Sequence, residues 1–116
     1  MKLIIAGGRD YQLTQSDYDE LDKIHAKDPV TEVVSGRATG ADTCGELWAK
    51  SRNIPIVPFS ANWGRYGKAA GPIRNMEMAQ YADAVALFPG GKGTQSMYDE
   101  AEKAGIVIYD FRNRAK

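Results

Sequence analysis

The chain lacks most features of secreted, membrane-bound or nucleic-acid-binding proteins. Its single cysteine, Cys44, excludes an intramolecular disulfide and is typical of a reducing compartment. Its apolar runs are too short to span a membrane, and the run after Lys2 is too short for a signal peptide. Fifteen basic residues balance fifteen acidic ones, so the excess positive charge that attracts nucleic acid is missing. We therefore expect a cytoplasmic protein without a membrane or nucleic-acid partner.

Motifs of the common catalytic centres are also missing. No metal-ligand spacing occurs, and neither a Walker motif nor a G-x-S-x-G elbow is present. We predict neither a metal nor a cofactor. Cys44 falls on the inward face of a predicted helix, so we interpret it as a core residue rather than a nucleophile, and His25, away from the predicted site, as a packing or surface residue.

The composition present is that of one globular domain. The chain has 116 residues, of which 43% are hydrophobic and 26% charged. We predict a single domain over residues 1–116. Short apolar runs predict strands over Lys2–Ala6, Thr31–Ser35, Ile54–Phe59, Asp83–Phe88 and Ile106–Phe111, and glycine or proline ends the first, second and fourth of them. Helical periodicity predicts helices over Asp17–Lys27, Ala38–Asn53, Pro72–Tyr81 and Thr94–Gly105.

Strands that alternate with helices indicate right-handed crossovers and a parallel sheet covered on both faces. Pro55 and Pro58 favour an edge position for the third strand. We predict an α/β fold, a Rossmann-like three-layer sandwich with a five-stranded parallel sheet in the order 3-2-1-4-5. Ser60–Gly71 has no clear periodicity and is predicted to be a long loop, and Arg112–Lys116 a polar tail.

Three glycine-rich turns follow three of these strands. They are Gly7–Asp10, Ser35–Gly40 and Pro89–Thr94. In the predicted fold all three open on one sheet edge, where glycines let backbone N–H groups approach an anion and helix N-termini favour it. The alternative is that glycine simply ends strands. Because three turns converge, we favour a phosphate site.

Basic residues at this edge support the same interpretation. Helix N-termini disfavour cations, yet three basic residues lie at or just before predicted helix starts: Arg37, Arg74 and Lys92. A fourth, Arg9, follows the first predicted strand. They suit a bound anion, unless they pair locally with Asp10 and Asp42. Asp42 would either cap a helix or bind a ribose hydroxyl, and spacing leaves both open.

The predicted loop carries two aromatic residues, Trp63 and Tyr66. Aromatic rings in such a loop suit stacking on a nucleobase. The alternative, that Trp63 anchors the loop to the core, remains open.

Four stretches resemble small SLOG-superfamily proteins related to the YspA/YpsA group, of the DUF2493 type. They are MKLIIAGGRDY, VVSGRATGAD, NWGRYGKAAGPIRNMEMA and FPGGKGT, and they cover nearly the whole chain in order. The resemblance implies a Rossmann-like fold that binds a nucleotide or nucleotide-derived ligand, in a bacterial or phage protein that forms a homodimer or larger assembly.

The superfamily includes the LOG phosphoribohydrolases, with the motifs R-K-x-x-M and P-G-G-x-G-T-x-x-E. Arg74, Asn75 and Met78 stand in the first, where Asn75 replaces the lysine. The second is kept at Pro89, Gly90, Gly91, Gly93 and Thr94. Its glutamate, which serves N-glycosidic cleavage in the LOG enzymes, is replaced by Met97, and Glu100 lies one helical turn further on.

Three functions follow as hypotheses. The first is a binding module, a sensor, carrier or sequestering protein for a nucleotide-like molecule. The second is a nucleoside 5′-monophosphate N-glycosidase that uses Arg74 with a relocated carboxylate, for which Glu100, Asp99 or Asp42 are candidates. The third, a single-stranded DNA binder, is disfavoured by the balanced charge. The predicted ligand-binding residues are Gly7, Gly8, Arg9, Ser35, Gly36, Arg37, Gly40, Asp42, Trp63, Arg74, Asn75, Pro89, Gly90, Gly91, Gly93 and Thr94.

Overall fold

The computed structural model describes residues 1–113, and the last three residues of the predicted polar tail lie outside this range. Five parallel strands form one sheet in the order β3-β2-β1-β4-β5. They are β1 (Lys2–Ala6), β2 (Glu32–Ser35), β3 (Ile56–Pro58), β4 (Ala84–Leu87) and β5 (Val107–Asp110). The predicted α/β class, Rossmann-like arrangement and strand order are confirmed, and the proline-containing strand is at an edge as expected.

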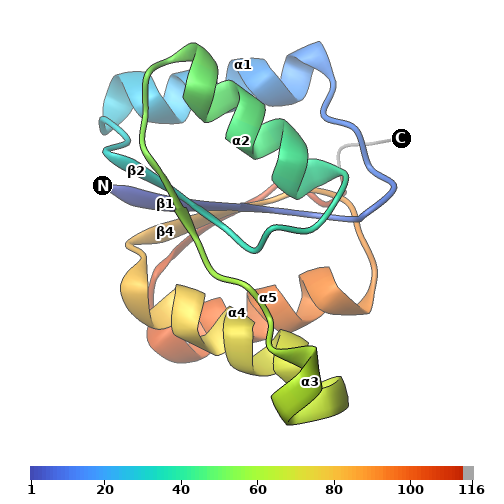
Figure 1. Ribbon diagram of the computed structural model, residues 1–116. Coiled ribbons are helices and arrows are strands. Elements are labelled where there is room, and N and C mark those ends of the chain that lie inside the picture. The colour runs from blue at the N-terminus through green and yellow to red at the C-terminus, as the bar shows by residue number, and fades with distance from the viewer. Residues whose placement is uncertain (114–116) are drawn as a thin grey trace.

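Helices cover both faces of the sheet, which gives three layers (Figure 1). On one face lie α1 (Gln15–Lys27) and α2 (Ala41–Ser51), and on the other α4 (Ala70–Tyr81) and α5 (Lys92–Ala104). A short helix, α3 (Trp63–Tyr66), and a 3₁₀ turn, η1 (Gly67–Ala69), lead into α4. Within residues 1–113 no helix has both the length and the apolar character needed to cross a membrane.

The central strand β1 divides the core in two, because its side chains alternate between the faces. Leu3 and Ile5 pack in the cluster under α1 and α2, which includes Leu21 and Trp48. Ile4, which pairs with neighbours in both β2 and β4, packs in the opposite cluster with residues such as Met78. A sheet buried on both faces explains why β4 is apolar throughout and why apolar residues follow one another in the middle of β1.

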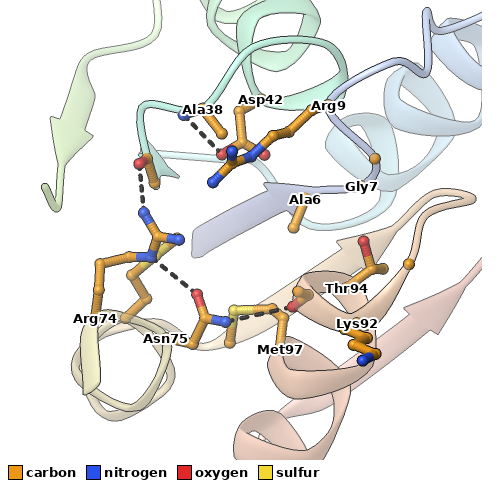
Figure 2. Close-up of a pocket in the computed structure, with 15 residues that line it drawn as sticks. Ala6, Gly7, Arg9, Ala38, Asp42, Arg74, Asn75, Lys92, Thr94 and Met97 are labelled. Carbon is orange, nitrogen blue, oxygen red and sulfur yellow. Dashed lines mark hydrogen bonds between the residues drawn. The ribbon is translucent and has the colours of Figure 1, made fainter. Parts of the chain in front are cut away.

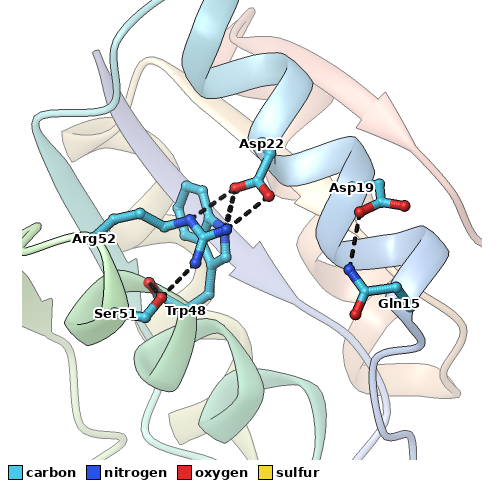
Figure 3. Close-up of polar contacts among 6 residues, drawn as sticks. All are labelled: Gln15, Asp19, Asp22, Trp48, Ser51 and Arg52. Carbon is cyan, nitrogen blue, oxygen red and sulfur yellow. Dashed lines mark hydrogen bonds and ion pairs between the residues drawn. The ribbon is translucent and has the colours of Figure 1, made fainter.

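Helices α1 and α2 are also joined by polar contacts (Figure 3). Asp22 accepts hydrogen bonds from Trp48 Nε1 at 2.9 Å and from Arg52 Nε and Nη2, both at 2.7 Å. Although burial raises the pKa of Asp22, these hydrogen bonds outweigh it and lower the pKa. The buried indole therefore has its hydrogen-bond partner, and Trp48 serves the core.

The predicted starts of all four helices are wrong by two or three residues, and α2 begins at Ala41 rather than Ala38 and α5 at Lys92 rather than Thr94. The first helix begins at Gln15 rather than at Asp17, because Thr14 caps it. The hydroxyl of Thr14 accepts the N–H of Asp17, and the carboxylate of Asp17 accepts the N–H of Thr14. Within the predicted loop Ser60–Gly71, the side chain of Asn62 caps α3, and α4 begins at Ala70 instead of Pro72. Arg74 consequently lies in the second turn of α4, away from the helix N-terminus where the charge argument had placed it.

Candidate functional site

The three glycine turns pack against one another at the carboxyl edge of the sheet. The N–H of Gly8 donates to the carbonyl of Pro89 at 2.8 Å, and the carbonyl of Gly8 accepts from Ala41 N–H at 3.2 Å. The first turn therefore lies between the other two and holds them together. Pro89, predicted as a ligand residue, lines no cavity described below and contributes this carbonyl.

Two predicted ligand glycines have a similar packing role. Gly40 has φ +69°, and a Cβ there would overlap the carbonyl oxygens of Gly8 and Arg9. A Cβ at Gly90 would overlap the hydroxyl of Thr94. Neither Gly40 nor Gly90 lines a cavity described below, so these glycines permit close backbone packing.

A cavity of about 320 Å³ opens beyond the carboxyl ends of β1 and β4 (Figure 2). This is the switch point of the sheet, where open α/β folds bind their ligands. The cavity brings together ten of the predicted site residues: Gly7, Gly8, Arg9, Gly36, Asp42, Arg74, Asn75, Gly91, Gly93 and Thr94.

Arg74 and Asn75 connect three elements across this cavity (Figure 2). From α4, Arg74 Nη1 donates to the carbonyl of Gly36 at 2.6 Å, and its Nε donates to Asn75 Oδ1 at 2.9 Å. Asn75 Nδ2 in turn donates to the carbonyl of Gly93 at 3.4 Å and to Ser96 Oγ at 3.2 Å. The guanidinium is thus fixed in the cavity wall by its own neighbours, which preorganises it for an anion.

Three cations face the cavity, and one carboxylate accompanies them. Arg9, Arg74 and Lys92 line it, and Asp42 is the carboxylate in its wall among residues 1–113. Burial, and then the charge of Arg9, lower the pKa of Arg74, which the charge of Asp42 partly opposes. The cavity therefore concentrates positive charge in a chain whose formal net charge is zero.

Asp42 is 7% exposed, and its Oδ2 accepts the backbone N–H of Ala38 at 3.2 Å. Burial raises the pKa of Asp42 to about 6, although the hydrogen bond from Ala38 and the charge of Arg74 oppose the rise. The charge of nearby Glu46 also raises this pKa, and the charge of Arg9 lowers it. This carboxyl group changes its charge close to neutral pH, at the wall of the cavity.

We expect Asp42→Asn to change how stability depends on pH. A raised pKa in the folded state means that the contribution of Asp42 is complete below its unfolded value and is lost as pH rises through about 6. Relative to the wild type, the variant should therefore gain on the order of 2 kcal/mol of unfolding free energy between pH 4 and pH 7. Urea unfolding at several pH values measures this. A difference that stays constant with pH would contradict it.

The predicted ligand residues Ser35 and Arg37 are engaged with each other and with Glu46. The buried Ser35 hydroxyl donates to Glu46 Oε2 at 2.6 Å and accepts the N–H of Arg37 at 3.2 Å. Arg37 Nη1 pairs with Glu46 Oε1 at 3.0 Å. The partner of Arg37 is therefore neither Asp10 nor Asp42, the acids considered from the sequence. Ser35 supports the turn without lining either cavity.

Of the two positions considered for the catalytic carboxylate, Met97 lines the cavity and Glu100 does not. Met97 is 1% exposed and its side chain forms part of the cavity wall. Glu100, the candidate relocated carboxylate, does not line the cavity and lies 3.7 Å from Lys103 in an ion pair.

Sequence reasoning missed several wall residues because they carry no recognisable chemistry. All three of Ala6, at the end of β1, Ala38, in the second glycine turn, and Met78, inside α4, line the cavity with apolar groups. Arg37 and Trp63 line a second cavity beside the first. No three His, Cys, Asp or Glu side chains gather as metal ligands anywhere in residues 1–113.

Comparison with known proteins agrees with this architecture. The chain is 34% identical to the gene 61 protein of Mycobacterium phage D29, over 97% of this chain and 98% of that protein. It shares the fold of DNA processing protein A (DprA) from Streptococcus pneumoniae, with a TM-score of 0.71 and 16% identity over 94% of this chain. It spans about half of DprA (49%). A second structure with this fold, TM1055, has a TM-score of 0.65 at 17% identity, over 92% of this chain and 71% of its own.

At such low sequence identity, the likeness to the two solved structures shows only that the fold is shared. Family membership comes from the sequence, since residues 1–66 match the family described as YspA, cpYpsA-related SLOG. The match includes the first two glycine turns and with them seven of the fifteen residues that line the first cavity. The chain belongs to the YspA, cpYpsA-related SLOG family.

Proposed function

We propose that this protein binds a nucleotide or nucleotide-derived small molecule, with a phosphate group in the cavity beyond β1 and β4. The observation that carries the proposal is the cavity wall, in which Arg9 and Arg74 face the N-terminus of α5. The protein acts as a binding module of the sensor, carrier or sequestering type.

The start of α5 supports a phosphate ligand. This helix has 13 residues, and its N-cap, Gly91, makes no side-chain capping bond. The N–H groups of the first turn lack partners within the helix, and the positive end of the helix dipole points the same way. Because Gly91, Lys92, Gly93 and Thr94 all line the cavity, this helix end suits an anion held there.

The rest of the wall suits the nucleoside. Asp42 would accept a hydrogen bond from a ribose hydroxyl, the function that the sequence left open beside capping. The apolar side chains of Ala6, Met78 and Met97 provide contact area for a ring. This mixture of an apolar wall and a few polar groups is usual for small-molecule sites.

Binding is proposed ahead of N-glycosidic cleavage because of Met97. Methionine supplies neither charge nor proton at the position where the LOG motif has its glutamate. Glu100 is outside the cavity wall and is paired with Lys103. If cleavage occurs, the carboxylate available to it in the wall is Asp42.

Gly93→Leu tests the site. A Cβ at Gly93 would have no atom within 4 Å, so leucine fits the helix and narrows the cavity. We expect the wild type to bind nucleotides in calorimetry against AMP, GMP, CMP, UMP and diadenosine diphosphate. Affinity in the variant should fall at least about tenfold, with unchanged or higher stability, because leucine favours helix more than glycine.

Ala104→Leu is the matched control, since it adds leucine at the exposed far end of the same helix. It should leave affinity unchanged. A wild type that binds none of these nucleotides at millimolar concentration would contradict the proposed function.

A further inference from the structure

A second cavity, also of about 320 Å³, lies beside the first. The two share four wall residues, Arg9, Gly36, Ala38 and Arg74. Each is at the lower end of the range of about 300 to 1,000 Å³ usual for small-molecule pockets. Together the two cavities have about twice the volume of either one, and they meet at the wall that they share.

The second cavity has an aromatic wall that the proposed nucleotide site does not use. Trp63, the first residue of α3, lines it and is 52% exposed, whereas Trp48 is 2% exposed in the core. A Cβ at Gly71 would lie 3.4 Å from Trp63 Cη2, so the indole edge lies near α4. An exposed indole beside a cavity is suited to stacking on a ring of a ligand.

The boundary between the two cavities is positively charged. Arg9 and Arg74 line both, and Arg74 Nη1 is fixed by its hydrogen bond to the Gly36 carbonyl. Gly36 keeps this boundary open, because a Cβ there would be 3.0 Å from Arg74 Nη1 and 3.1 Å from Asp42 Oδ2. Two guanidinium groups at the junction match a bridging phosphate rather than a neutral linker.

We propose that the ligand is a dinucleotide, with one nucleoside in each cavity and a phosphate bridge held between Arg9, Arg74 and the start of α5. The base in the second cavity stacks on Trp63, and the polar side chains of Thr39 and Ser60 are placed to contact its sugar. This inference rests on the proposed function, because it assumes the nucleotide site in the first cavity. It predicts that a mononucleotide fills half of the available site.

The test compares AMP with diadenosine diphosphate, which joins two AMP units through their phosphates. The dinucleotide should bind at least tenfold more tightly than AMP to the wild-type chain. Trp63→Ala should remove this gain and leave AMP affinity unchanged, whereas Trp63→Phe should restore most of it. Tyr66→Ala is the matched control, because Tyr66 is an exposed aromatic of the same short helix that lines neither cavity.

Acrylamide quenching of tryptophan fluorescence gives a readout without a variant, since Trp63 is exposed and Trp48 is buried. The dinucleotide should protect the quenchable tryptophan, and AMP should not. Equal affinity for AMP and the dinucleotide, or no protection, overturns the inference and leaves the proposed function standing. Binding of neither ligand overturns both. A single-stranded dA₁₀ oligonucleotide that binds more than tenfold tighter than the dinucleotide also overturns it, in favour of a DNA strand.

Discussion

Replacing Gly40 with alanine is expected to lower the free energy of unfolding by about 3 kcal/mol or more. Gly40 has φ +69° and ψ −124°, a conformation that residues with a side chain avoid. The added Cβ would also overlap the carbonyl oxygens of Gly8 and Arg9. The second turn would have to separate from the first, and the contact between the carbonyl of Gly8 and Ala41 N–H would be lost. Urea unfolding measures the loss.

Gly105→Ala is the matched control for this substitution. Gly105 has almost the same φ, +71°, but lies in the ordinary left-handed region at the C-cap of α5, with no atom within 4 Å of a Cβ. Alanine there should cost only about 1 kcal/mol. Similar losses for the two variants would mean that close packing between the turns adds nothing to stability.

The fold was predictable because its signals are local and repeat along the chain. Short apolar runs such as Lys2–Ala6 predict the strands, three of them are ended by glycine or proline, and Pro55 and Pro58 predict the edge. Helix starts were less predictable, because a cap depends on which side chain returns to the backbone. Thr14 and Asn62 cap two helices, and nothing in their own chemistry separates them from neighbouring Ser16 or Ser60.

The position of the cavity was predictable for a topological reason. Parallel strands place all their carboxyl ends at one edge, so the three turns had to meet there. Their separate roles were not predictable, because they depend on contacts between turns. The sequence alone does not reveal that Gly40 packs on Gly8, or that Glu46 engages Ser35 and Arg37.

The burial of Asp42 in the cavity wall could not be predicted from the sequence. Asp42 looked like either a cap or a ribose ligand, and the structure buries it beside Arg74 and Glu46. Burial is what raises its pKa to about 6. Spacing along the chain contains no information on the burial of a side chain, because the groups around Asp42 come from the turns after β1 and β2, from α2 and from α4.

Arg74 is the side chain whose loss should weaken ligand binding most. It lines both cavities, is partly buried, and is held in place by the Gly36 carbonyl at 2.6 Å. A charge-assisted hydrogen bond to phosphate contributes about 1.5 to 3 kcal/mol, so Arg74→Met should weaken binding of a phosphate-bearing nucleotide roughly 10- to 150-fold. The variant should also lose about 1 kcal/mol of stability, since the hydrogen bonds to Gly36 and Asn75 disappear.

Arg37→Met removes the same charge from a neighbouring turn and is the matched control. Because Arg37 is already paired with Glu46 and lies outside the first cavity, AMP affinity should change little. Calorimetry with AMP and with adenosine separates the phosphate contact from general damage to the site. Arg74→Met should weaken AMP binding and leave the much weaker adenosine binding as it is in the wild type. An equal loss for both ligands would assign Arg74 to holding the cavity wall, and an equal loss in both variants would assign the effect to overall charge. A selective loss of AMP binding places the phosphate at the guanidinium of Arg74.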